Sequence, residues 1–353
     1  MCSDVLEVVE HRDTSMPINA FAAPHARAAL QRFEYGPSVL SPYDVEVAIS
    51  HCGVCHSDVH LIDNDWGSSH YPLVPGHEIV GTVTARGSHV DSLSIDQRVG
   101  IGWQAGSCLR CEWCREGFEN LCQNKTLTCV GRPGGFADFI LLDSRFVFPI
   151  PASLDSRSAA PLLCAGLTVY APMRRFALQP HHRIGIVGLG GLGHVAAQFA
   201  DAMGCDVTVF STHPDKEDDA RRFGAQHFIH SRDDEQMQKV TRTLDFILST
   251  VPAQLPWSAY LKTLRPNGHL IVVNRGGFDN ASTVTIPTSE LVAGQKSISG
   301  TVTGGRALMR DMLVFAARHH VETQTETMRL ADVNAAVQRV RDSTARYRIV
   351  LQP

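Results

Sequence analysis

The sequence of 353 residues lacks three features that would place it in other classes of protein. It has no run of about 18 apolar residues, so no segment is long enough to span a membrane as a helix. Its 32 Lys and Arg are balanced by 36 Asp and Glu, and a net charge of −4 argues against a basic nucleic-acid-binding face. Residues 1–14 are acidic rather than basic and have no apolar core, so they do not resemble a signal peptide. We therefore expect a cytoplasmic globular protein of one large or two domains that binds neither nucleic acid nor membranes.

Cysteine is abundant, with 10 residues, and four of them fall within 15 positions. Their spacing is Cys108-x2-Cys111-x2-Cys114-x7-Cys122. In a cytosolic chain such a cluster indicates metal binding rather than disulfides. Four thiolates complete a tetrahedral Zn²⁺ site with no open position, which predicts a structural zinc. An iron–sulfur cluster is the alternative, because close C-x-x-C spacing also occurs there.

The chain changes character near residue 151. Before it, short strands such as 44–49, 79–84 and 136–142 predict a barrel or sandwich. After it, strands alternate with helices, which predicts a parallel doubly wound sheet and an α/β fold. The strands expected here are 183–187, 206–210, 245–249 and 269–273, and the helices are 194–203, 216–223 (with Gly224 as its C-cap) and 257–264. The last 50 residues predict helices 307–317 and 333–340 and a strand 347–351.

A glycine-rich turn of the form G-x-G-x-x-G spans residues 188–193. It follows an apolar strand and opens a helix, which is the context of a dinucleotide-binding turn. Gly188 allows the tight turn, Gly190 lets a pyrophosphate approach the backbone, and Gly193 lets helix and strand pack closely. The alternative is an ordinary strand–helix turn without a ligand.

The next strand ends without the Asp or Glu that would bind the ribose 2′-hydroxyl of NAD. Ser211 and Thr212 stand there instead, and Lys216 follows. Hydroxyls and a cation suit a 2′-phosphate, so the pattern favours NADP(H). The alternative is that Lys216 is a solvated residue of a helix's first turn.

Potential metal ligands are dense in residues 51–60, in Gly76-His77-Glu78 and around Cys164. With these motifs the sequence resembles the zinc-dependent medium-chain alcohol dehydrogenases, and within them the cinnamyl alcohol dehydrogenase-type, NADP-dependent branch. The resemblance runs from about residue 17 to the end. It rests on G-V-C-H-S-D-V-H, Y-P-L-V-P-G-H-E, the four-cysteine lobe, L-C-A-G-L-T and G-L-G-G-L-G, in that order.

The resemblance implies a second, catalytic zinc and its surroundings. Its ligands would be Cys55, His77 and Cys164, with Glu78 as an occasional or indirect ligand, and three ligands plus one open position is the catalytic pattern. Asp58 would stabilise the zinc environment, Ser57 would contact the substrate oxygen and His60 would pass a proton towards solvent. The residues implied to contact the cofactor are His56, Thr168, Gly188, Gly190, Gly191, Leu192, Gly193, Ser211, Thr212, Lys216, Thr250, Val251, Asn274, Ser299, Gly300, Thr301 and Arg348.

Several of these residues also have simpler interpretations. Taken alone, Cys164 is a small core residue and His56 and His60 are surface histidines, while Asp58 could be a helix N-cap. Cys52 competes with Cys55 as a ligand on local spacing, and the family motif favours Cys55. The residues without an expected role are Cys2, Cys129 and Cys205, and the candidates to line a substrate pocket are Trp66 and Trp103, with Leu291 and Val302 more often core.

The resemblance also implies the architecture. A GroES-like, β-rich catalytic domain would comprise residues 1–164 and 302–353, and a Rossmann domain would comprise 165–301. The expected function is a zinc-dependent NADP(H) alcohol dehydrogenase or aldehyde reductase. It would interconvert small-molecule primary alcohols and aldehydes, aromatic or medium aliphatic, with two zinc ions per chain and as a homodimer. The alternatives are an NAD(H)-preferring enzyme of the same fold, a zinc-less reductase, and a non-catalytic dinucleotide- and zinc-binding protein.

Overall fold

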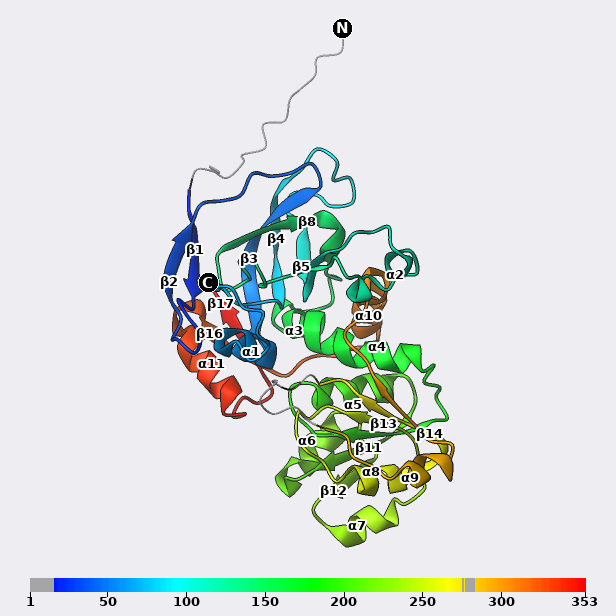
Figure 1. Ribbon diagram of the computed structural model, residues 1–353. Helices are drawn as coiled ribbons and strands as arrows, with labels where there is room; N and C mark the ends of the chain where they lie inside the picture. Colours follow the sequence, from blue (N-terminus) through cyan, green and yellow to red (C-terminus); the bar gives the residue numbers. More distant parts are fainter. Residues whose placement is uncertain (1–15, 275, 277–282) are drawn as a thin grey trace.

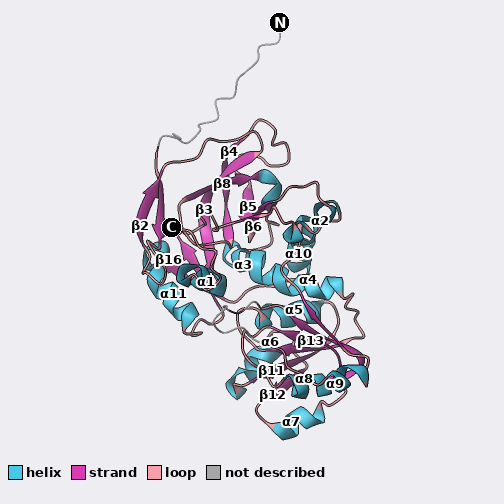
Figure 2. Cartoon of the chain, in the orientation of Figure 1, coloured by secondary structure: helices cyan, strands magenta, loops and turns pink. Residues whose placement is uncertain are grey.

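The computed structural model describes residues 16–274, 276 and 283–353. Two large sheets dominate it, one in each half of the molecule (Figure 1). Figure 2 shows that strands and loops prevail in the half that holds the N-terminus, whereas helices cover the sheet in the other half. The GroES-like and Rossmann α/β fold class is confirmed by this arrangement.

The first sheet has seven strands and is mainly antiparallel, with β8 paired to β3 off the main order β16-β17-β3-β4-β5-β9. Its central strands β3, β4, β5 and β17 are buried over most of their length, so both faces of the sheet are largely covered. Its strands are β3 (Asp44–Val54), β4 (Ile79–Arg86), β5 (Arg98–Ile101), β8 (Phe139–Asp143), β9 (Val147–Pro149), β16 (Thr325–Arg329) and β17 (Arg348–Gln352). The separate ribbons are β1 (Ile18–Ala22) with β2 (Gln31–Tyr35), and β6 (Gln104–Gly106) with β7 (Thr126–Leu127).

The second sheet has six parallel strands in the order β12-β11-β10-β13-β14-β15. The order reverses between β10 and β13, and in such sheets a ligand binds beyond the carboxyl ends of the strands at this point. The strands are β10 (Arg183–Val187), β11 (Asp206–Ser211), β12 (His227–His230), β13 (Leu244–Ser249), β14 (Leu264–Val272) and β15 (Ser297–Gly300). The helices of this half are α5 (Gly193–Ala202), α6 (Glu217–Arg222), α7 (Asp234–Lys239), α8 (Trp257–Thr263) and α9 (Thr288–Val292).

Helical segments join the two halves. Residues 156–175 form α3 (Ser156–Pro161), a π-helical turn (Leu162–Gly166) and α4 (Leu167–Arg175) without a break. The expected boundary at residue 164 lies inside this π-helical turn, and the one at residue 301 lies just after β15. α10 (Arg306–His319) packs beside α4, and α11 (Val333–Arg341) packs beside α1 (His56–Asp63) (Figure 1).

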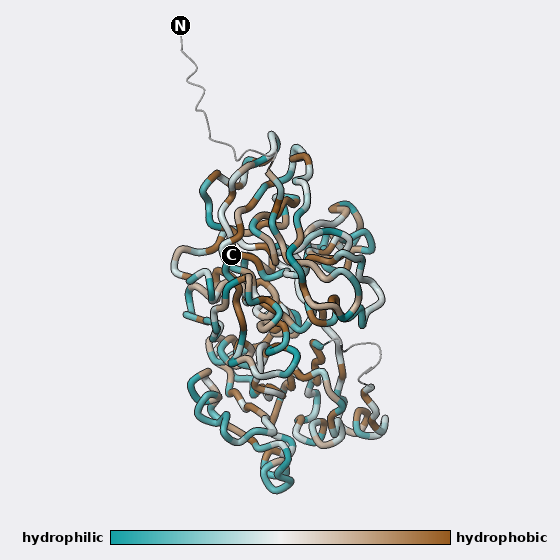
Figure 3. The backbone as a smooth tube through the Cα atoms, turned by 90° about the vertical axis from the view of Figure 1, so that its left-hand side faces the viewer, coloured by the Kyte–Doolittle hydropathy of each residue, from teal (hydrophilic) through white to brown (hydrophobic). Residues whose placement is uncertain are grey.

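The core is continuous across this junction. One buried cluster joins Val80 and Val350 of the first sheet to Ile184 and Ile186 of the second through α3 and α4. Figure 3 shows hydrophobic segments inside both halves and hydrophilic segments on many outer loops. No helix among the described residues is long and apolar enough to cross a membrane.

The expected elements are present, with shifted ends. β3 continues to Val54, so the ligand-rich stretch that begins at His51 is still strand for four residues. β14 begins at Leu264, where the sequence predicted the end of a helix. Gly224 has a φ of 91° just after α6, which suits its expected place at a helix C-terminus.

Candidate active site

Four potential metal ligands meet where the first sheet faces α3 and α4. Cys55 precedes α1, His77 and Glu78 precede β4, and Cys164 lies in the π-helical turn. One ligand atom from each of the four lies within 4.8 Å of the others. Segments more than 80 residues apart therefore supply a single cluster.

His77 shows that this cluster fits a cation. Its Nδ1 lies 3.0 Å from Asp58 Oδ1, which fixes the ring and leaves Nε2 as the metal-binding nitrogen. Nε2 is buried and has no hydrogen-bond partner among the described residues, which is costly unless a ligand satisfies it. With two thiols and a carboxylate beside it, this nitrogen completes a donor set that suits zinc.

Asp58 connects the segments that carry the ligands. Its side chain accepts hydrogen bonds from the backbone N–H groups of Cys55 and Gly76, both at 2.9 Å, as well as facing His77. Asp58 is not the N-cap of α1; Cys55 is, and Asp58 is the third helical residue of a reciprocal capping box. One buried carboxylate thus holds the segments of two ligands together.

Charges inside the cluster are coupled. A hydrogen bond between the thiols of Cys55 and Cys164 lowers the pKa of Cys55 and raises that of Cys164, so one thiol donates to the other. Burial raises the pKa of Glu78 to about 7, although Arg348 opposes the shift. Two thiols that share one proton in this way become two thiolates when a cation replaces the proton.

Glu78 links the cluster to the glycine-rich turn. Its Oε1 accepts a hydrogen bond from buried Arg348, while its Oε2 has no partner among the described residues. A Cβ on Gly53 would collide with Oε2, so only glycine lets β3 pass this close. Arg348 also reaches the turn, because a Cβ on Gly191 would lie 3.1 Å from its Nη1. A pyrophosphate at the turn would therefore be within the range of Arg348.

Polar residues on α1 lead outward from the cluster. Ser57 and His60 are three residues apart, which places them on one helix face. His60 Nδ1 lies 2.7 Å from Asp65 Oδ2, so Nε2 is the ring nitrogen left to exchange a proton with other groups. The His56 ring lies 6.2 Å from that of His60 and is exposed. The arrangement offers a short chain of groups that can carry a proton.

Two tryptophans form an aromatic wall along these groups. Trp103 packs edge-on against His77 at 4.8 Å and against Trp66 at 6.1 Å, and Trp66 lies 5.2 Å from His60. Trp66 Nε1 donates to the carbonyl of Gly276, 3.3 Å away, beyond β14. Trp66 and Trp103, the candidate pocket residues, therefore lie beside the cluster. Leu291 is partly buried in the core of the second sheet, as expected. Val302 is 55% exposed, so the expectation that it is a core residue is wrong.

The four-cysteine lobe has the dimensions of a single tetrahedral ion. The Cys108 sulfur lies 3.9 Å from that of Cys114 and 3.5 Å from that of Cys122, and all four ligand atoms lie within 4.8 Å. Metal–sulfur bonds of about 2.3 Å in a tetrahedron separate the sulfurs by about 3.8 Å, which matches one ion rather than a multi-iron cluster.

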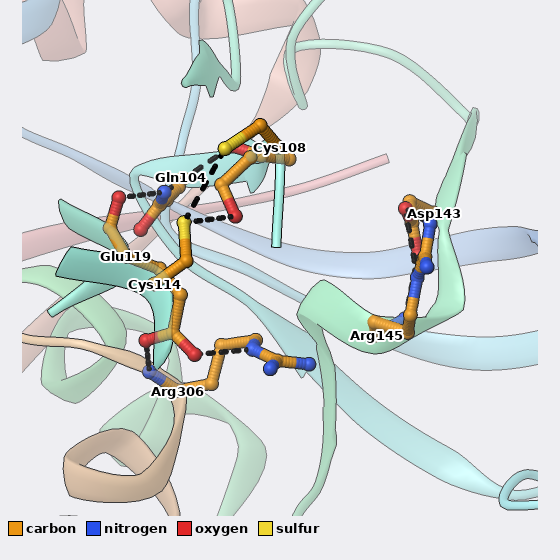
Figure 4. A network of polar contacts seen from close by, with 9 residues as sticks. Gln104, Cys108, Cys114, Glu119, Asp143, Arg145 and Arg306 are labelled. Atoms are coloured by element: carbon orange, nitrogen blue, oxygen red, sulfur yellow. Dashed lines mark hydrogen bonds and ion pairs between the residues drawn. The ribbon is translucent and has the colours of Figure 1, made fainter. Parts of the chain in front are cut away.

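The lobe is anchored to the start of α10. Buried Glu119 accepts hydrogen bonds from the backbone and side chain of Arg306 at 3.1 and 2.8 Å (Figure 4). Its carbonyl accepts another from Gln104 at 2.7 Å. The lobe therefore fixes the segment through which the chain returns from the second sheet.

The glycine-rich turn has the geometry expected for a pyrophosphate. Gly188 has a φ of 90°, and a Cβ on Gly193 would collide with the Gly188 carbonyl. Gly190 has open space around its Cβ position, which leaves room for a ligand. Thr250 Oγ1 donates to the Val187 carbonyl at 2.8 Å, and Val251 packs against Gly188, so both residues support the turn.

Unpartnered polar atoms gather beyond the carboxyl ends of the parallel strands. Ser249 ends β13, Asn274 follows β14, and Thr301 follows Ser299 and Gly300 of β15. The Ser249 hydroxyl, the Asn274 amide nitrogen and the Thr301 hydroxyl are buried without a partner among the described residues. Such groups are normally satisfied, so they indicate a polar ligand at this edge. Thr168, on α4, is half-buried and Leu192 precedes α5.

The residues expected to bind a 2′-phosphate differ in their burial and in the hydrogen bonds that they already make. Lys216 is half-buried and its Nζ donates to the carbonyl of Leu189 at 2.9 Å, so its interpretation as a solvated residue is wrong. Burial lowers the pKa of Lys216. Ser211 is buried and its hydroxyl pairs with the backbone of His213, whereas Thr212 is exposed. Lys216 is therefore the group most directly placed at the turn.

Three residues near the site had no expected role. Cys129 is buried, and its sulfur lies within 4.8 Å of ligand atoms of Asp58 and His77. Asp65 pairs with His60, and Tyr347 packs beside Lys216. Spacing could have suggested Asp65, five residues after His60, but no local sequence pattern marks Cys129 or Tyr347.

The remaining cysteines lie outside the two clusters. Cys52 is buried outside the four-residue cluster, Cys205 is buried in the core, and Cys2 lies outside the described residues.

Comparison with known proteins defines the class of this site. Residues 41–152 match the alcohol dehydrogenase GroES-like domain and residues 191–318 match the zinc-binding dehydrogenase domain. The chain therefore belongs to the zinc-binding alcohol dehydrogenases and, within them, to the cinnamyl alcohol dehydrogenase type. Members of this class are oxidoreductases that interconvert alcohols and aldehydes.

Individual relatives agree with this placement. The chain is 39% identical over 338 residues to an aldehyde reductase from Synechocystis, covering 95% of this chain and 98% of the relative. It is 41% identical over 335 residues to a probable cinnamyl alcohol dehydrogenase from Oryza sativa, covering 89% and 75%. The structure of a cinnamyl alcohol dehydrogenase from Sorghum bicolor superposes with a TM-score of 0.90 at 38% identity, covering 96% and 98%. The structure of CAD from Helicobacter pylori complexed with NADP(H) superposes with a TM-score of 0.88 at 28% identity, covering 96% and 98%.

Proposed function

We propose that this chain is a zinc-dependent NADP(H) alcohol dehydrogenase or aldehyde reductase acting on primary alcohols and aldehydes. The observation that carries the proposal is the unpartnered Nε2 of His77 beside two thiols, next to a glycine-rich turn. Buried polar atoms need partners, and a zinc ion and a dinucleotide would provide them together. If these residues had only a structural role, neither the unpartnered Nε2 of His77 nor the unpartnered polar atoms at the edge of the second sheet would be explained.

The groups present support two metal sites in each chain. The catalytic zinc would be held by Cys55, His77 and Cys164, with Glu78 as an occasional or indirect ligand. The four-cysteine lobe would hold a structural zinc. When bound, the catalytic zinc polarises a carbonyl oxygen and the nicotinamide supplies hydride to the carbonyl carbon. Two thiolates in the ligand set reduce the net charge of that site.

The remaining steps belong to side chains of this chain. In aldehyde reduction, Ser57 gives its proton to the substrate oxygen, and His60 passes a proton from solvent back to Ser57. Asp65 faces Nδ1 of His60 and thereby fixes its tautomer. Arg348 and the backbone of the glycine-rich turn hold the pyrophosphate, with His56 nearby.

The preference for NADP(H) rests on Lys216. Its ammonium lies at the turn, and no carboxylate stands at the end of β11 to bind a ribose 2′-hydroxyl. A related structure, that of Helicobacter pylori CAD, was determined with NADP(H), which supports the same choice.

The substrate class follows from the aromatic wall. Trp66 and Trp103 lie beside the zinc ligand His77 and the proton-carrying His60. Flat aromatic aldehydes such as cinnamaldehyde and benzaldehyde can pack against such rings. The names of relatives from Oryza and Sorghum support the same substrates, and medium aliphatic aldehydes remain within the proposal.

We also propose the domain boundaries and the homodimer that the family resemblance implies. The outer edge of β15 has no neighbouring strand among the described residues, and Val302 beyond it is exposed. Pairing of two such edges would join the second sheets of two chains.

The decisive experiment combines metal analysis with turnover. Cys164→Ala should remove oxidation of NADPH by cinnamaldehyde and lower the zinc content from two ions per chain to one, because the lobe keeps its ion. Cys205→Ala, at a buried cysteine that belongs to neither cluster, is the matched control and should keep both zinc ions. Normal turnover in Cys164→Ala would contradict the proposed ligand set, and two bound zinc ions without turnover of any aldehyde would favour a binding protein.

A further inference from the structure

Lys216 is supported by a residue from the C-terminal segment of the chain. Its Nζ lies 5.6 Å from the ring centroid of Tyr347, within the range of a cation–π contact. The same Nζ donates to the Leu189 carbonyl at 2.9 Å. The ammonium is therefore held between the glycine-rich turn and an aromatic ring that lies 131 positions further along the chain.

The Tyr347 ring is itself fixed from several sides. It stacks on His194 at 5.0 Å with an interplanar angle of 22°, and Phe223 meets it edge-on at 5.3 Å. Its hydroxyl donates to Asp219 Oδ2, and the side chain is buried. Such a ring offers Lys216 a rigid face.

The carboxylate of Asp219 fixes the hydroxyl end of the Tyr347 ring. Burial lowers the pKa of Lys216, and Asp215 and, to a smaller extent, Asp219 oppose that shift. In the structure this carboxylate is occupied by Tyr347, by Arg222 at 2.6 Å and by Arg346 at 3.1 Å. The Asp219 carboxylate thus anchors Tyr347, and Arg222 and Arg346 hold that carboxylate in turn.

The same strip of chain continues to the zinc cluster. A Cβ on Gly191 would lie 3.4 Å from the Tyr347 carbonyl, and the next residue, Arg348, pairs with Glu78. Tyr347 therefore lies between the adenosine end of the proposed cofactor and the catalytic end.

We propose that Tyr347 is a positioning residue for cofactor specificity: it holds Lys216 free to bind a 2′-phosphate. This inference rests on the proposed NADP(H) preference. It predicts that discrimination between NADPH and NADH is set partly from the C-terminal segment rather than by the second sheet alone.

The test compares Tyr347→Leu with Tyr347→Phe in the full-length enzyme. The Leu variant removes the ring, so the affinity for NADPH and for 2′,5′-ADP should fall by about fivefold or more, a typical effect of a desolvated cation–π contact. Affinities for NADH and 5′-AMP should change by less than about twofold, a change that corresponds to under about 0.4 kcal/mol. The Phe variant keeps the ring, and Arg222 and Arg346 still hold Asp219, so its preference should stay near that of the parent.

A matched control separates positioning from general damage. Tyr170→Leu also removes a buried tyrosine with an arginine over its ring, at 5.9 Å, but on α4, and it should leave the cofactor ratio unchanged. If the Leu variant does not fold, Tyr347→Met fills a similar volume without a ring and takes its place.

The outcomes distinguish this inference from the proposed function. Lys216→Met should reduce affinity for 2′,5′-ADP; if it does not, the NADP(H) proposal and this inference both fail. If Lys216→Met has that effect but Tyr347→Leu weakens 2′,5′-ADP and 5′-AMP equally, Tyr347 only joins the two halves of the molecule and this inference alone is overturned.

Discussion

At the scale of single residues, the two nitrogens of His77 have different roles: one contacts Asp58 and the other is left to bind a metal ion. Nδ1 faces the buried carboxylate of Asp58, and Nε2 faces the cluster without a partner. A carboxylate behind a ligating histidine fixes the ring and makes its free nitrogen more basic. Metal affinity therefore depends on Asp58, which would not itself touch the ion.

Asp58→Asn should weaken catalytic zinc binding by roughly 10- to 100-fold. The amide cannot accept all three of the hydrogen bonds that Asp58 now receives from Cys55, Gly76 and His77. Zinc retention during titration with a chelator would measure this, and the lobe zinc serves as the internal control. Unchanged retention of both ions would show that Asp58 does not hold His77 in its ligating orientation.

Trp103→Ala should lower kcat/KM for cinnamaldehyde more than for a short aliphatic aldehyde. Truncation of this half-buried tryptophan side chain removes its apolar surface, and it also removes the edge contacts with His77 and Trp66. Steady-state rates with the two aldehydes would give the ratio, and Trp113→Ala, at an exposed tryptophan of the lobe, is the control. An equal loss with both aldehydes would mean that Trp103 supports His77 and does not select the substrate.

At the scale of elements, α5 is tied to the C-terminal segment by His194. Its Nδ1 lies 2.9 Å from the Gly190 carbonyl and its Nε2 accepts from the Gln324 N–H at 3.2 Å. Burial lowers the pKa of His194 to about 3. The folded state therefore holds a neutral imidazole at pH values where the unfolded chain is protonated.

This depressed pKa predicts a loss of stability in acid. Between the unfolded pKa of about 6.5 and about 3, the unfolded chain binds the extra proton, so His194 destabilises the fold by about 1.4 kcal/mol for each unit that the pH falls. His194→Gln loses part of the hydrogen bonding and should be less stable than the parent at pH 7.5, by about 1–3 kcal/mol. At pH 5 most of that difference should disappear, because the variant does not titrate.

Urea unfolding at the two pH values measures the effect, and the difference between parent and variant isolates His194 from other titrating groups. His319→Gln, at an exposed histidine at the end of α10, is the control for removing a histidine away from this contact. A parent-minus-variant difference that does not depend on pH would show that His194 binds a proton equally well in the folded and unfolded chains.

At the scale of the whole molecule, the two sheets are joined by α3, α4 and α10 and by the strip from Arg346 to Arg348. The edge strand β15 is the outermost strand of the second sheet. Exposed edges of this kind pair readily with another chain.

We expect the protein to be a dimer in solution, with a mass of twice 38.6 kDa by light scattering. Val302→Asp should shift the population towards the single chain, because a charge beside the edge would be buried on pairing. Val39→Asp, at the still more exposed Val39 of the first half, is the control. A single-chain mass for the parent protein would contradict the proposed β15 pairing.

Much of the fold could be predicted from the sequence because its signals are local. Alternating apolar residues, the Gly188–Gly193 turn and the four-cysteine spacing each act within 20 residues, and each appears in the structure where it was expected. The family motifs also selected Cys55 over Cys52, which lies outside the four-residue cluster. Element ends were less predictable, as β14 shows, because pairing with β13 and β15 decides where a strand starts.

The sequence by itself determined the residue types that can bind a metal and a dinucleotide, since ligand chemistry and glycine conformation depend on single residues and short spacings. Only the tertiary structure decided which distant groups act on one another. Asp58 lies behind His77, Arg348 joins Glu78 to Gly191, and Tyr347 holds Lys216, all across tens to hundreds of positions. These partners meet because burial of apolar surface brings the two sheets together, and no local pattern in the chain records which side chains then share the junction.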